Sequence, residues 1–223
     1  MAVAMGVDIG GTFTDIVVLG EGGPRLYKFP STPDDPARGV LAALEELIAR
    51  GEIRPGSVTR IAHGSTVATN ALLEGKLGKT ALVTTTGFRD VLEIGRQNRP
   101  ALYDLFFERV QPIVPRELRF EVPERVDAQG NVIRPLDRAA VAQLLPELRR
   151  LGVEAVAVCF LFSFLFPDHE REAGEVLAGL GVPLTLSCDL LPEFREYERT
   201  STTVVNAALR PVVGSYLAAV EEG

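Results

Sequence analysis

Hydrophobic and polar positions alternate in short runs along the first thirty residues, a pattern typical of β-strands. Two runs rich in valine and isoleucine flank a turn of a few residues that contains Gly10 and Gly11. So short a turn between two strand-like runs predicts a tight hairpin. Residues 24–29 predict a third strand, antiparallel to the hairpin, after the glycine-rich turn at residues 20–23.

Helical spacing begins after this three-stranded region. Asp35 and Pro36 suit the N-cap and first position of a helix whose apolar positions recur as far as Ile48, and Gly51 suits its end. Beyond it, predicted strands and helices alternate. Strands are predicted at residues 57–62, 79–85, 154–161 and 182–187, and helices at residues 67–73, 88–94, 138–151 and 168–180.

The apolar run at residues 154–161 is almost unbroken, which predicts a strand buried on both faces in a sheet covered by helices. Helical spacing is lost over residues 101–136, where prolines recur, so a strand-rich insertion is expected there. Pro146 and Pro211 fall inside helical patterns and are expected to kink or interrupt them.

Two further expectations concern charged and polar side chains. The dense charge at residues 193–199 predicts a solvated helix face stabilised by pairs three and four residues apart. His169 is expected in the first turn of its helix, in an exposed structural role.

The glycine turn also carries candidate chemistry. Gly10 and Gly11 allow the backbone to approach a ligand closely, and exposed N–H groups in such a turn suit phosphate oxygens. Thr12 and Thr14 add hydroxyl groups, and Asp8 at the end of the first strand suits a hydrated Mg²⁺. The alternative is a hairpin that binds nothing, because glycine-rich hairpins with an aspartate are common.

Rival phosphate motifs do not fit this chain. Gly6 and Gly11 have the spacing of a P-loop, but Thr12 stands where a lysine is required. No G-x-G-x-x-G sequence is present, which argues against a dinucleotide-binding turn.

Two other segments hold polar groups. His63, Ser65 and Thr66 follow a predicted strand and precede a helix, where hydroxyl and N–H groups suit an anion. The local pattern favours plain N-capping by Ser65 or Thr66. Arg96 and Arg99 lie in a polar loop, for which solvated surface is the default, although paired arginines also grip carboxylates.

Composition narrows the function classes. The chain has 223 residues, a formal charge of −7 and no basic run, which argues against nucleic acid or an anionic membrane as partner. The apolar run at residues 155–166 is too short to span a bilayer. Cys159 and Cys188 are expected to be buried free thiols rather than a disulfide or metal pair. A cytoplasmic globular protein is predicted.

Five stretches together carry a family resemblance. The chain resembles the N-terminal region of the hydantoinase/oxoprolinase family, the A-type subunit of ATP-dependent hydantoin hydrolases and 5-oxoprolinases. Subunits of acetone carboxylases resemble the same family. The stretches are GVDIGGTFTD at residues 6–15, HGSTVATNALLE at 63–74, GFRDVLEIGRQ at 87–97, FLFSF with PDHE at 160–170, and LPEFREYERTSTT at 191–203.

The resemblance implies a fold and a reaction. The fold is the ribonuclease-H-like α/β lobe of the sugar kinase, Hsp70 and actin superfamily, a mixed sheet with an N-terminal antiparallel hairpin and flanking helices. In the reaction, ATP phosphorylates a carbonyl oxygen of a small cyclic amide and the ring then opens with water, often with help from a second, B-type subunit. The cofactors implied are ATP and Mg²⁺.

The resemblance also implies residue roles. Phosphate would be held by Gly10, Gly11, Thr12 and Thr14, and Asp15 would either belong to that set or fix the hairpin. Asp8 would hold Mg²⁺ through water and, with His63 and Thr66, would face the catalytic cleft. Substrate contacts would come from Arg96, Arg195 and Glu198.

Members of the family are considerably longer than this chain. No second Gly-Gly-Thr follows residue 15, so we expect a lobe at residues 1–190 and, at 191–223, the start of a connecting helix and a truncated following domain. The missing lobe or a B-type subunit is the expected partner, and the fragment is expected to be inactive alone. Alternatives are a non-catalytic binding or assembly module, a subunit of a related ATP-dependent carboxylase, and an acyl-phosphate or sugar kinase.

Overall fold

The computed structural model describes residues 2–32, 34–98, 103–104, 106 and 110–222. Contacts within the chain divide it into two compact units. Unit 1 comprises Met1–Lys76 and Val212–Gly223, and unit 2 comprises Leu77–Pro211. This division rests on contacts within the chain and does not test a domain boundary. The predicted boundary between residues 190 and 191 therefore stays a prediction.

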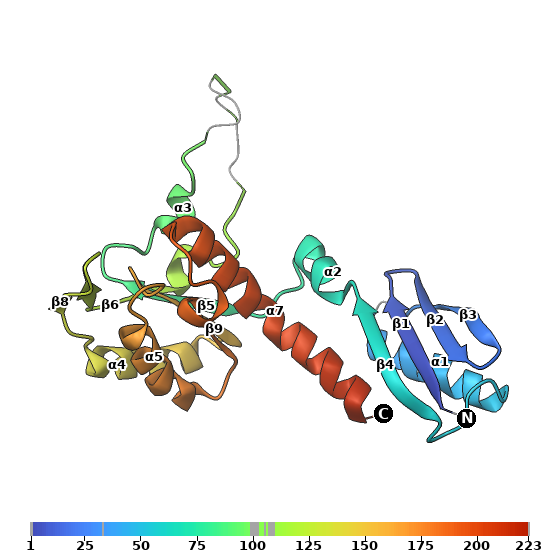
Figure 1. Ribbon diagram of the computed structural model, residues 1–223. Coiled ribbons are helices and arrows are strands. Elements are labelled where there is room, and N and C mark those ends of the chain that lie inside the picture. The colour runs from blue at the N-terminus through green and yellow to red at the C-terminus, as the bar shows by residue number, and fades with distance from the viewer. Residues whose placement is uncertain (1, 33, 99–102, 105, 107–109, 223) are drawn as a thin grey trace. The chain divides into compact units, whose positions relative to one another are not determined.

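Unit 1 is built on a four-stranded sheet in the order β3-β2-β1-β4 (Figure 1). The β1, β2 and β3 strands are antiparallel neighbours, which confirms the predicted hairpin and third strand, and β4 runs parallel to β1. The bounds in this unit are β1 Val3–Ile9, β2 Phe13–Gly20, β3 Gly23–Pro30, α1 Pro36–Ala49, β4 Val58–Ser65 and α2 Val67–Glu74.

The α1 helix covers one face of this sheet (Figure 1). As predicted, Asp35 caps it, because the Asp35 side chain accepts a hydrogen bond from the N–H of Arg38 and Pro36 stands at the first helical position. The core contains alternate residues of β1 and β2 together with one face of α1. The buried members include Met5, Val7, Ile9, Ile16, Val18, Ala37, Val40, Ala43 and Leu47.

Unit 2 holds a second four-stranded sheet, parallel throughout, in the order β10-β9-β5-β6. Every residue of β9 is buried, which confirms the strand expected to be covered on both faces. The main elements are β5 Thr80–Thr85, α3 Val91–Ile94, β6 Arg119–Val122, β7 Arg125–Val126, β8 Val132–Arg134, α4 Arg138–Arg150, β9 Ala155–Cys159, α5 Asp168–Leu177, β10 Leu184–Leu186 and α6 Ser187–Leu190.

Helices lie on both faces of this second sheet (Figure 1). The side chain of Leu186 contacts α5 at Gly174, whereas the hydroxyl of Thr185 lies 3.0 Å from Oδ1 of Asn206 on the long helix α7, Glu196–Glu222. Because neighbouring strand residues point to opposite faces, α5 and the first half of α7 lie on opposite sides of β10.

Neither Pro146 nor Pro211 interrupts its helix, so that expectation is wrong, and the alternative of a kink stays a prediction. The α4 helix runs unbroken through Pro146, and α7 runs unbroken through Pro211. Proline removes the hydrogen bond to the carbonyl four residues earlier. In α4 that carbonyl belongs to Ala142, which is exposed as Pro146 is, so the missing bond lies on the solvent side of the helix.

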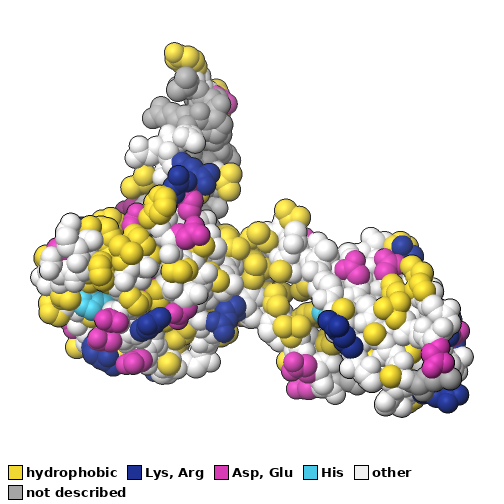
Figure 2. Space-filling view, viewed as in Figure 1, with side chains coloured by type: hydrophobic (Ala, Val, Ile, Leu, Met, Phe, Trp, Pro, Cys, Tyr) yellow, Lys and Arg dark blue, Asp and Glu magenta, His cyan; other side chains and the backbone are white. Residues whose placement is uncertain are grey.

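The insertion expected at residues 101–136 is strand-rich in part. Its β6 strand pairs with β5, and β7 pairs with β8 as a small antiparallel ribbon. Residues 101–102, 105 and 107–109 lie outside the described residues. Large apolar side chains are exposed in the remainder, where Tyr103, Phe106 and Val110 are each more than nine-tenths accessible, and Figure 2 shows hydrophobic side chains in this segment.

Two expectations about the exposure of polar side chains are also wrong, although His169 does lie in the first turn of α5 as predicted. The His169 side chain is only 11% exposed, and its Nδ1 lies 2.9 Å from Oε2 of the buried Glu124. Arg199, in the segment predicted to be a solvated face, is fully buried. Both side chains find polar partners at the ends of buried strands, which local sequence spacing does not reveal.

Among the described residues, α7 is the one helix long and apolar enough, by length and composition, to cross a membrane. That is weak evidence, because core helices have the same properties. Val204, Ala207 and Ala208 on this helix are buried within unit 2, whereas Leu217 is 45% exposed.

Candidate functional site

The glycine turn between β1 and β2 is braced on one side by residue 31, just after β3. The hydroxyl of Ser31 donates to the carbonyl of Gly10 at 2.8 Å, and the N–H of Ser31 donates to the carbonyl of Thr12 at 2.9 Å. Across the turn, the N–H of Gly10 donates to the carbonyl of Phe13 at 2.9 Å. These bonds hold the carbonyls of the turn inward.

A second brace comes from the start of α2. The hydroxyl and the N–H of Thr66 both donate to the carbonyl of Ile9, at 3.0 and 3.1 Å. The side-chain amide of Asn70 in turn donates to Oγ1 of Thr66 at 3.2 Å. The N-cap of α2 is Thr66, whose side chain makes no capping bond, whereas the hydroxyl of Ser65, one residue earlier, accepts from the N–H of Val67 at 3.1 Å. The turn is therefore fixed from two directions before any ligand arrives.

Thr14 does not have the surroundings expected of a phosphate ligand. It is fully buried, and its hydroxyl lies 3.0 Å from the hydroxyl of Ser31. Its side chain belongs to the first brace and points away from solvent. Gly11 and Thr12, by contrast, are exposed, and Gly10 is half-buried, so these three residues form the accessible part of the turn.

Asp8 and Asp15 face each other across the hairpin. They are direct partners in the β1–β2 register, so their exposed side chains share the face of the sheet opposite α1. Lys28 on β3 lies 3.3 Å from Oδ1 of Asp15. Gly64 on β4 lies beside Asp8, where an added Cβ would stand 2.9 Å from Oδ1 of Asp8. The absence of a side chain at Gly64 leaves room for this carboxylate.

His63 lies on the other face of the same sheet. It pairs with Val7, a core residue, whereas Asp8 pairs with Gly64 one position along. The Nε2 atom of His63 lies 2.5 Å from the hydroxyl of Tyr216, in the part of α7 that belongs to unit 1. Burial raises the pKa of the Tyr216 hydroxyl. The structure therefore does not bring His63 together with Asp8.

The carboxylate pair fits Mg²⁺ bound with a nucleotide. The described residues hold no cluster of three or more His, Cys, Asp or Glu side chains placed to share a metal ion. Mg²⁺ in phosphate-transfer sites needs only one or two carboxylates, because water and phosphate oxygens complete its shell. Asp8 and Asp15, next to a turn with exposed N–H groups, meet that requirement.

A pocket of about 480 Å³ opens beside the same turn, entirely within unit 1. It lies on the α1 side of the sheet and reaches from Gly10 and Gly11 to α2 and the last turns of α7. Asn70 and Ser31 both line it, so the two braces of the turn also form part of its wall.

The three predicted substrate residues lie together in unit 2. Nε of Arg96 lies 2.8 Å from Oε1 of Glu198, and this hydrogen bond holds the pKa of the Glu198 carboxyl below its usual value. Arg195 is exposed and has φ +77°, a conformation that is strained for a long side chain. Its guanidinium lies 5.4 Å from the centre of the Phe194 ring.

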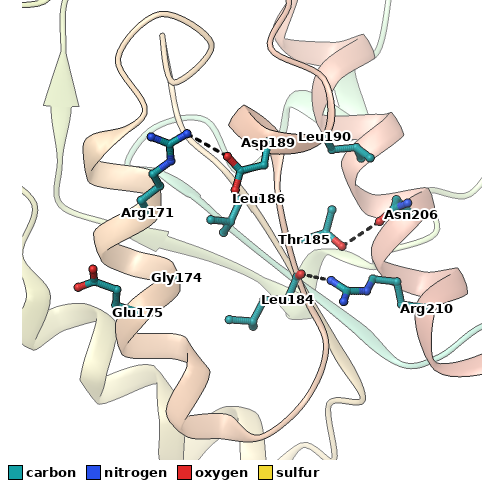
Figure 3. A pocket seen from close by; sticks show the side chains of 10 residues that line it. All are labelled: Arg171, Gly174, Glu175, Leu184, Thr185, Leu186, Asp189, Leu190, Asn206 and Arg210. Carbon is teal, nitrogen blue, oxygen red and sulfur yellow. Dashed lines mark hydrogen bonds and ion pairs between the residues drawn. The ribbon is translucent and has the colours of Figure 1, made fainter. Parts of the chain in front are cut away.

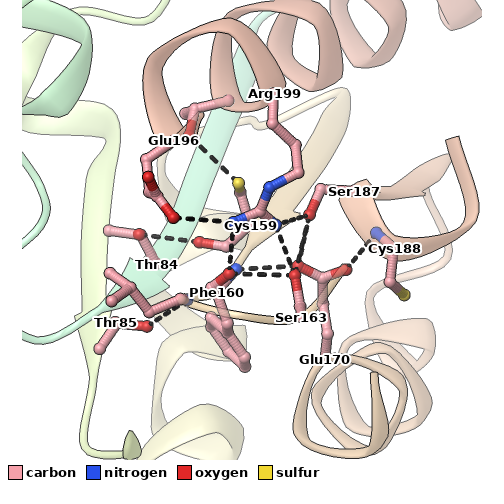
Figure 4. A network of polar contacts seen from close by, with 12 residues as sticks. Thr84, Thr85, Cys159, Phe160, Ser163, Glu170, Ser187, Cys188, Glu196 and Arg199 are labelled. Carbon is pink, nitrogen blue, oxygen red and sulfur yellow. Dashed lines mark hydrogen bonds and ion pairs between the residues drawn. The ribbon is translucent and has the colours of Figure 1, made fainter. Parts of the chain in front are cut away.

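Unit 2 also contains a buried polar network around Arg199, shown in Figure 4. The Arg199 guanidinium donates to the hydroxyl of Ser187 at 2.6 Å and to the carbonyl of Phe160 at 2.8 Å, and it also donates to Ser163. Glu170, likewise fully buried, accepts from the hydroxyl of Ser187 at 2.8 Å. Ser187 thus links the two buried charges, and the network ties the first turns of α7 to the end of β9.

A second hollow of about 480 Å³ lies between α5, β10 and α7 (Figure 3). Its polar groups are largely paired with one another. Arg171 binds Asp189 at 3.1 Å, Thr185 binds Asn206, and Arg210 donates to the carbonyl of Leu184. This internal pairing makes the hollow a weaker candidate site than the pocket at the glycine turn.

Comparisons with known proteins identify the family. Residues 4–181 match the profile of the hydantoinase/oxoprolinase N-terminal region. An uncharacterized protein of Methanocaldococcus jannaschii is 42% identical over 97% of this chain. The caprolactamase subunit alpha of Pseudomonas jessenii is 36% identical over 96% of it, and the acetophenone carboxylase gamma subunit of Aromatoleum aromaticum is 35% identical over 92%.

The crystal structure of the ATP-dependent caprolactamase from Pseudomonas jessenii gives a TM-score of 0.86 over 98% of this chain, at 36% identity. That likeness confirms the predicted fold class, the α/β lobe of the actin-like ATPases. The chain spans only about a third of these relatives: 32% of the caprolactamase subunit, 30% of the carboxylase subunit and 33% of the crystallised chain. By sequence and by fold, this chain belongs to the hydantoinase/oxoprolinase family and corresponds to its N-terminal region.

Proposed function

We propose that this chain is the nucleotide-binding N-terminal part of an ATP-dependent hydrolase of cyclic amides. The observation that carries the proposal is the pairing of Asp8 with Asp15 beside the braced glycine turn. The similarity to a caprolactamase subunit supports the substrate class. Bound Mg²⁺-ATP would supply a phosphoryl group to the amide carbonyl oxygen, and two waters would be consumed as the ring opens and phosphate is released.

The residues of the turn divide into two roles under this proposal. The N–H of Gly11 and the hydroxyl of Thr12 bind phosphate oxygens, because both residues are exposed. The N–H of Gly10 is taken by the carbonyl of Phe13, so Gly10 contributes by letting the phosphate approach the backbone closely. Asp8 holds Mg²⁺ through water, with Asp15 as its neighbour. Thr14 and Thr66 position the turn through their hydrogen bonds to Ser31 and Ile9. Positioning of this kind is the main protein contribution to phosphoryl transfer.

His63 has a positioning role rather than a catalytic one in this scheme. Its Nε2 is hydrogen-bonded to Tyr216, on the face of the sheet away from Asp8. The exposed Arg195 and the Arg96–Glu198 pair remain proposed substrate contacts. The remaining two-thirds of a longer polypeptide, or a B-type subunit, is the proposed partner, and a cytoplasmic location stays a prediction.

A subunit of an ATP-dependent carboxylase is the second candidate, favoured by the 35% identity to the acetophenone carboxylase gamma subunit. Both candidates share the nucleotide site and differ in the acceptor, which is an amide in one and a ketone in the other. Non-catalytic binding is the remaining alternative.

The test is a chimera in which these 223 residues replace the matching third of caprolactamase subunit alpha. We expect lactam-dependent ADP release, and we expect Asp8→Ala to abolish it. Asp127→Ala, in the turn between β7 and β8 of unit 2, is the control and is expected to leave it unchanged. ADP release that depends on a ketone and bicarbonate, and not on a lactam, would favour the carboxylase instead. The chain by itself is expected to show no ring opening.

A further inference from the structure

The pocket at the glycine turn has apolar side walls. Val67 and Ala71 line it from α2, and Tyr216 and Ala219 line it from the last turns of α7. All four residues belong to unit 1. Its volume of about 480 Å³ lies within the range of small-molecule sites, which are typically lined by apolar groups with a few polar groups that set orientation.

The polar groups of the pocket gather at its end next to the turn. Ser31, Thr66 and Asn70 line that end, and each already takes part in bracing the turn. The Asn70 side chain donates through Nδ2 to Thr66, and an amide side chain also carries a carbonyl oxygen that accepts from an N–H group. A ligand with an N–H beside a carbonyl matches this end of the pocket.

The charges that line the pocket are mostly negative. Three carboxylates line it, from Asp34, Asp35 and Glu74, against one ammonium group, from Lys76. Nζ of Lys76 lies 2.7 Å from Oε2 of Glu74, so that positive charge is largely neutralised within the pocket rim. A ligand that carries a negative charge would therefore be repelled by Asp34 and Asp35 on entering the pocket.

We infer that this pocket is the subsite for the ring of the substrate and that it takes an uncharged cyclic amide in preference to one that carries a carboxylate. The methylene groups of the ring lie against Val67 and Ala219, and its carbonyl faces Gly10 and Gly11. The carboxylates of Asp8 and Asp15 lie on the opposite face of the sheet, so ring and phosphate approach the turn from its two sides. The inference rests on the proposed function.

The experiment compares two probes with the same ring, one of which also carries a carboxylate. Saturation-transfer NMR of the chain at neutral pH, with and without a Mg²⁺-bound non-hydrolysable ATP analogue, measures binding of 2-pyrrolidinone and of 5-oxoproline, the same ring with a carboxylate. We expect 2-pyrrolidinone to bind at least about fivefold more tightly, the effect of about 1 kcal/mol of repulsion in water. Equal or tighter binding of 5-oxoproline would overturn the inference.

Two neighbouring alanines on α7 give a matched pair of variants. Ala219 lines the pocket, and Ala218, also exposed, does not. Ala219→Leu fills the pocket and is expected to weaken binding of 2-pyrrolidinone at least fivefold, whereas Ala218→Leu leaves it unchanged. Asp34→Asn is expected to bring the affinity for 5-oxoproline closer to the affinity for 2-pyrrolidinone. Equal effects of the two leucine variants would place the ring elsewhere.

The outcome for the pocket is separable from the outcome for the nucleotide site. If neither probe binds while Mg²⁺-ATP binding depends on Asp8, the assignment of the pocket is wrong and the proposed function stands. If the probes bind as expected and the chain shows no Asp8-dependent nucleotide binding, the pocket assignment stands and the nucleotide part of the proposed function is wrong.

Discussion

Gly64 lies against the carboxylate of Asp8, on the adjacent parallel strand and on the same face of the sheet. An added Cβ at residue 64 would stand 2.9 Å from Oδ1 of Asp8, closer than real Cβ contacts. The φ of Gly64 is not in the left-handed region, so the backbone accepts a side chain there. The glycine therefore provides space for one orientation of Asp8 rather than an unusual backbone conformation.

Gly64→Ala tests this relationship. The added methyl group would force the Asp8 carboxylate to rotate, so we expect Mg²⁺-ATP binding to weaken about tenfold, equivalent to about 1.4 kcal/mol, with little change in thermal stability. Gly6→Ala is the matched control, because an added Cβ there meets only an ordinary contact with Val17 at 3.9 Å. Equal binding by the two variants would show that the orientation of Asp8 does not matter.

Thr14 and Thr12 should respond differently to loss of their hydroxyl groups. Thr14→Val removes the bond between the buried Thr14 and the half-buried Ser31 hydroxyl, which keeps its bond to Gly10, and we expect it to lower the free energy of unfolding by about 1 kcal/mol. Thr12→Val, at an exposed position, is expected to leave stability unchanged and to weaken nucleotide binding. Denaturant unfolding and nucleotide titration of both variants measure the two effects. Loss of binding at full stability in Thr14→Val would restore Thr14 as a phosphate ligand.

Arg199 should contribute strongly to the stability of unit 2. Arg199→Met removes its hydrogen bonds to Ser163, Ser187 and Phe160 and leaves Glu170 without a buried counter-charge, so we expect a loss of about 3 to 5 kcal/mol. Arg195→Met, four residues earlier and exposed, should cost less than about 0.5 kcal/mol. Urea unfolding followed by circular dichroism measures both. Similar losses would mean that the buried network adds little.

We expect the buried thiols of Cys159 and Cys188 to make the stability of the chain fall at alkaline pH. Burial raises the pKa of Cys159 and of Cys188 in the folded chain. Above about pH 8.5 the unfolded chain releases these protons while the folded chain keeps them, so the free energy of unfolding falls as pH rises. Urea unfolding between about pH 8 and 9.5, below the ionisation of ordinary tyrosines, follows this fall.

The control for the thiol prediction is the double variant Cys159→Ala with Cys188→Ala. It should show a lower stability at neutral pH and a flatter dependence on pH over the same interval. An unchanged slope in the double variant would assign the alkaline fall to other groups.

Much of the fold could be predicted from local patterns. The hairpin, the capped α1 helix and the buried β9 strand follow from alternation, from Asp35 with Pro36, and from an unbroken apolar run. The second sheet could not be separated from the first in the same way, because strand order depends on which distant segments pair. Burial of Arg199 escaped prediction for the same reason, since its partners lie 12 to 39 residues away.

The sequence predicted several residues of the candidate site, but it did not predict on which face of the sheet each side chain lies. The sequence pointed to Asp8 and the glycines, but the separation of His63 from Asp8 depends on the β1–β4 register, in which His63 pairs with Val7. The sequence did not point to Ser31 and Asn70, because they contact the turn from outside the hairpin, Ser31 from the end of β3 and Asn70 from α2. A hydroxyl residue two positions after the third predicted strand was the one available signal for Ser31.

The most direct test of the account is a calorimetric titration of the chain with Mg²⁺-ATP, repeated with Asp8→Ala. We predict measurable binding that requires Mg²⁺ and that Asp8→Ala weakens at least tenfold, with circular dichroism showing an intact fold. Binding of equal strength in the variant, or no binding by the original chain, would contradict the claim that the glycine turn and the Asp8–Asp15 pair form a nucleotide site.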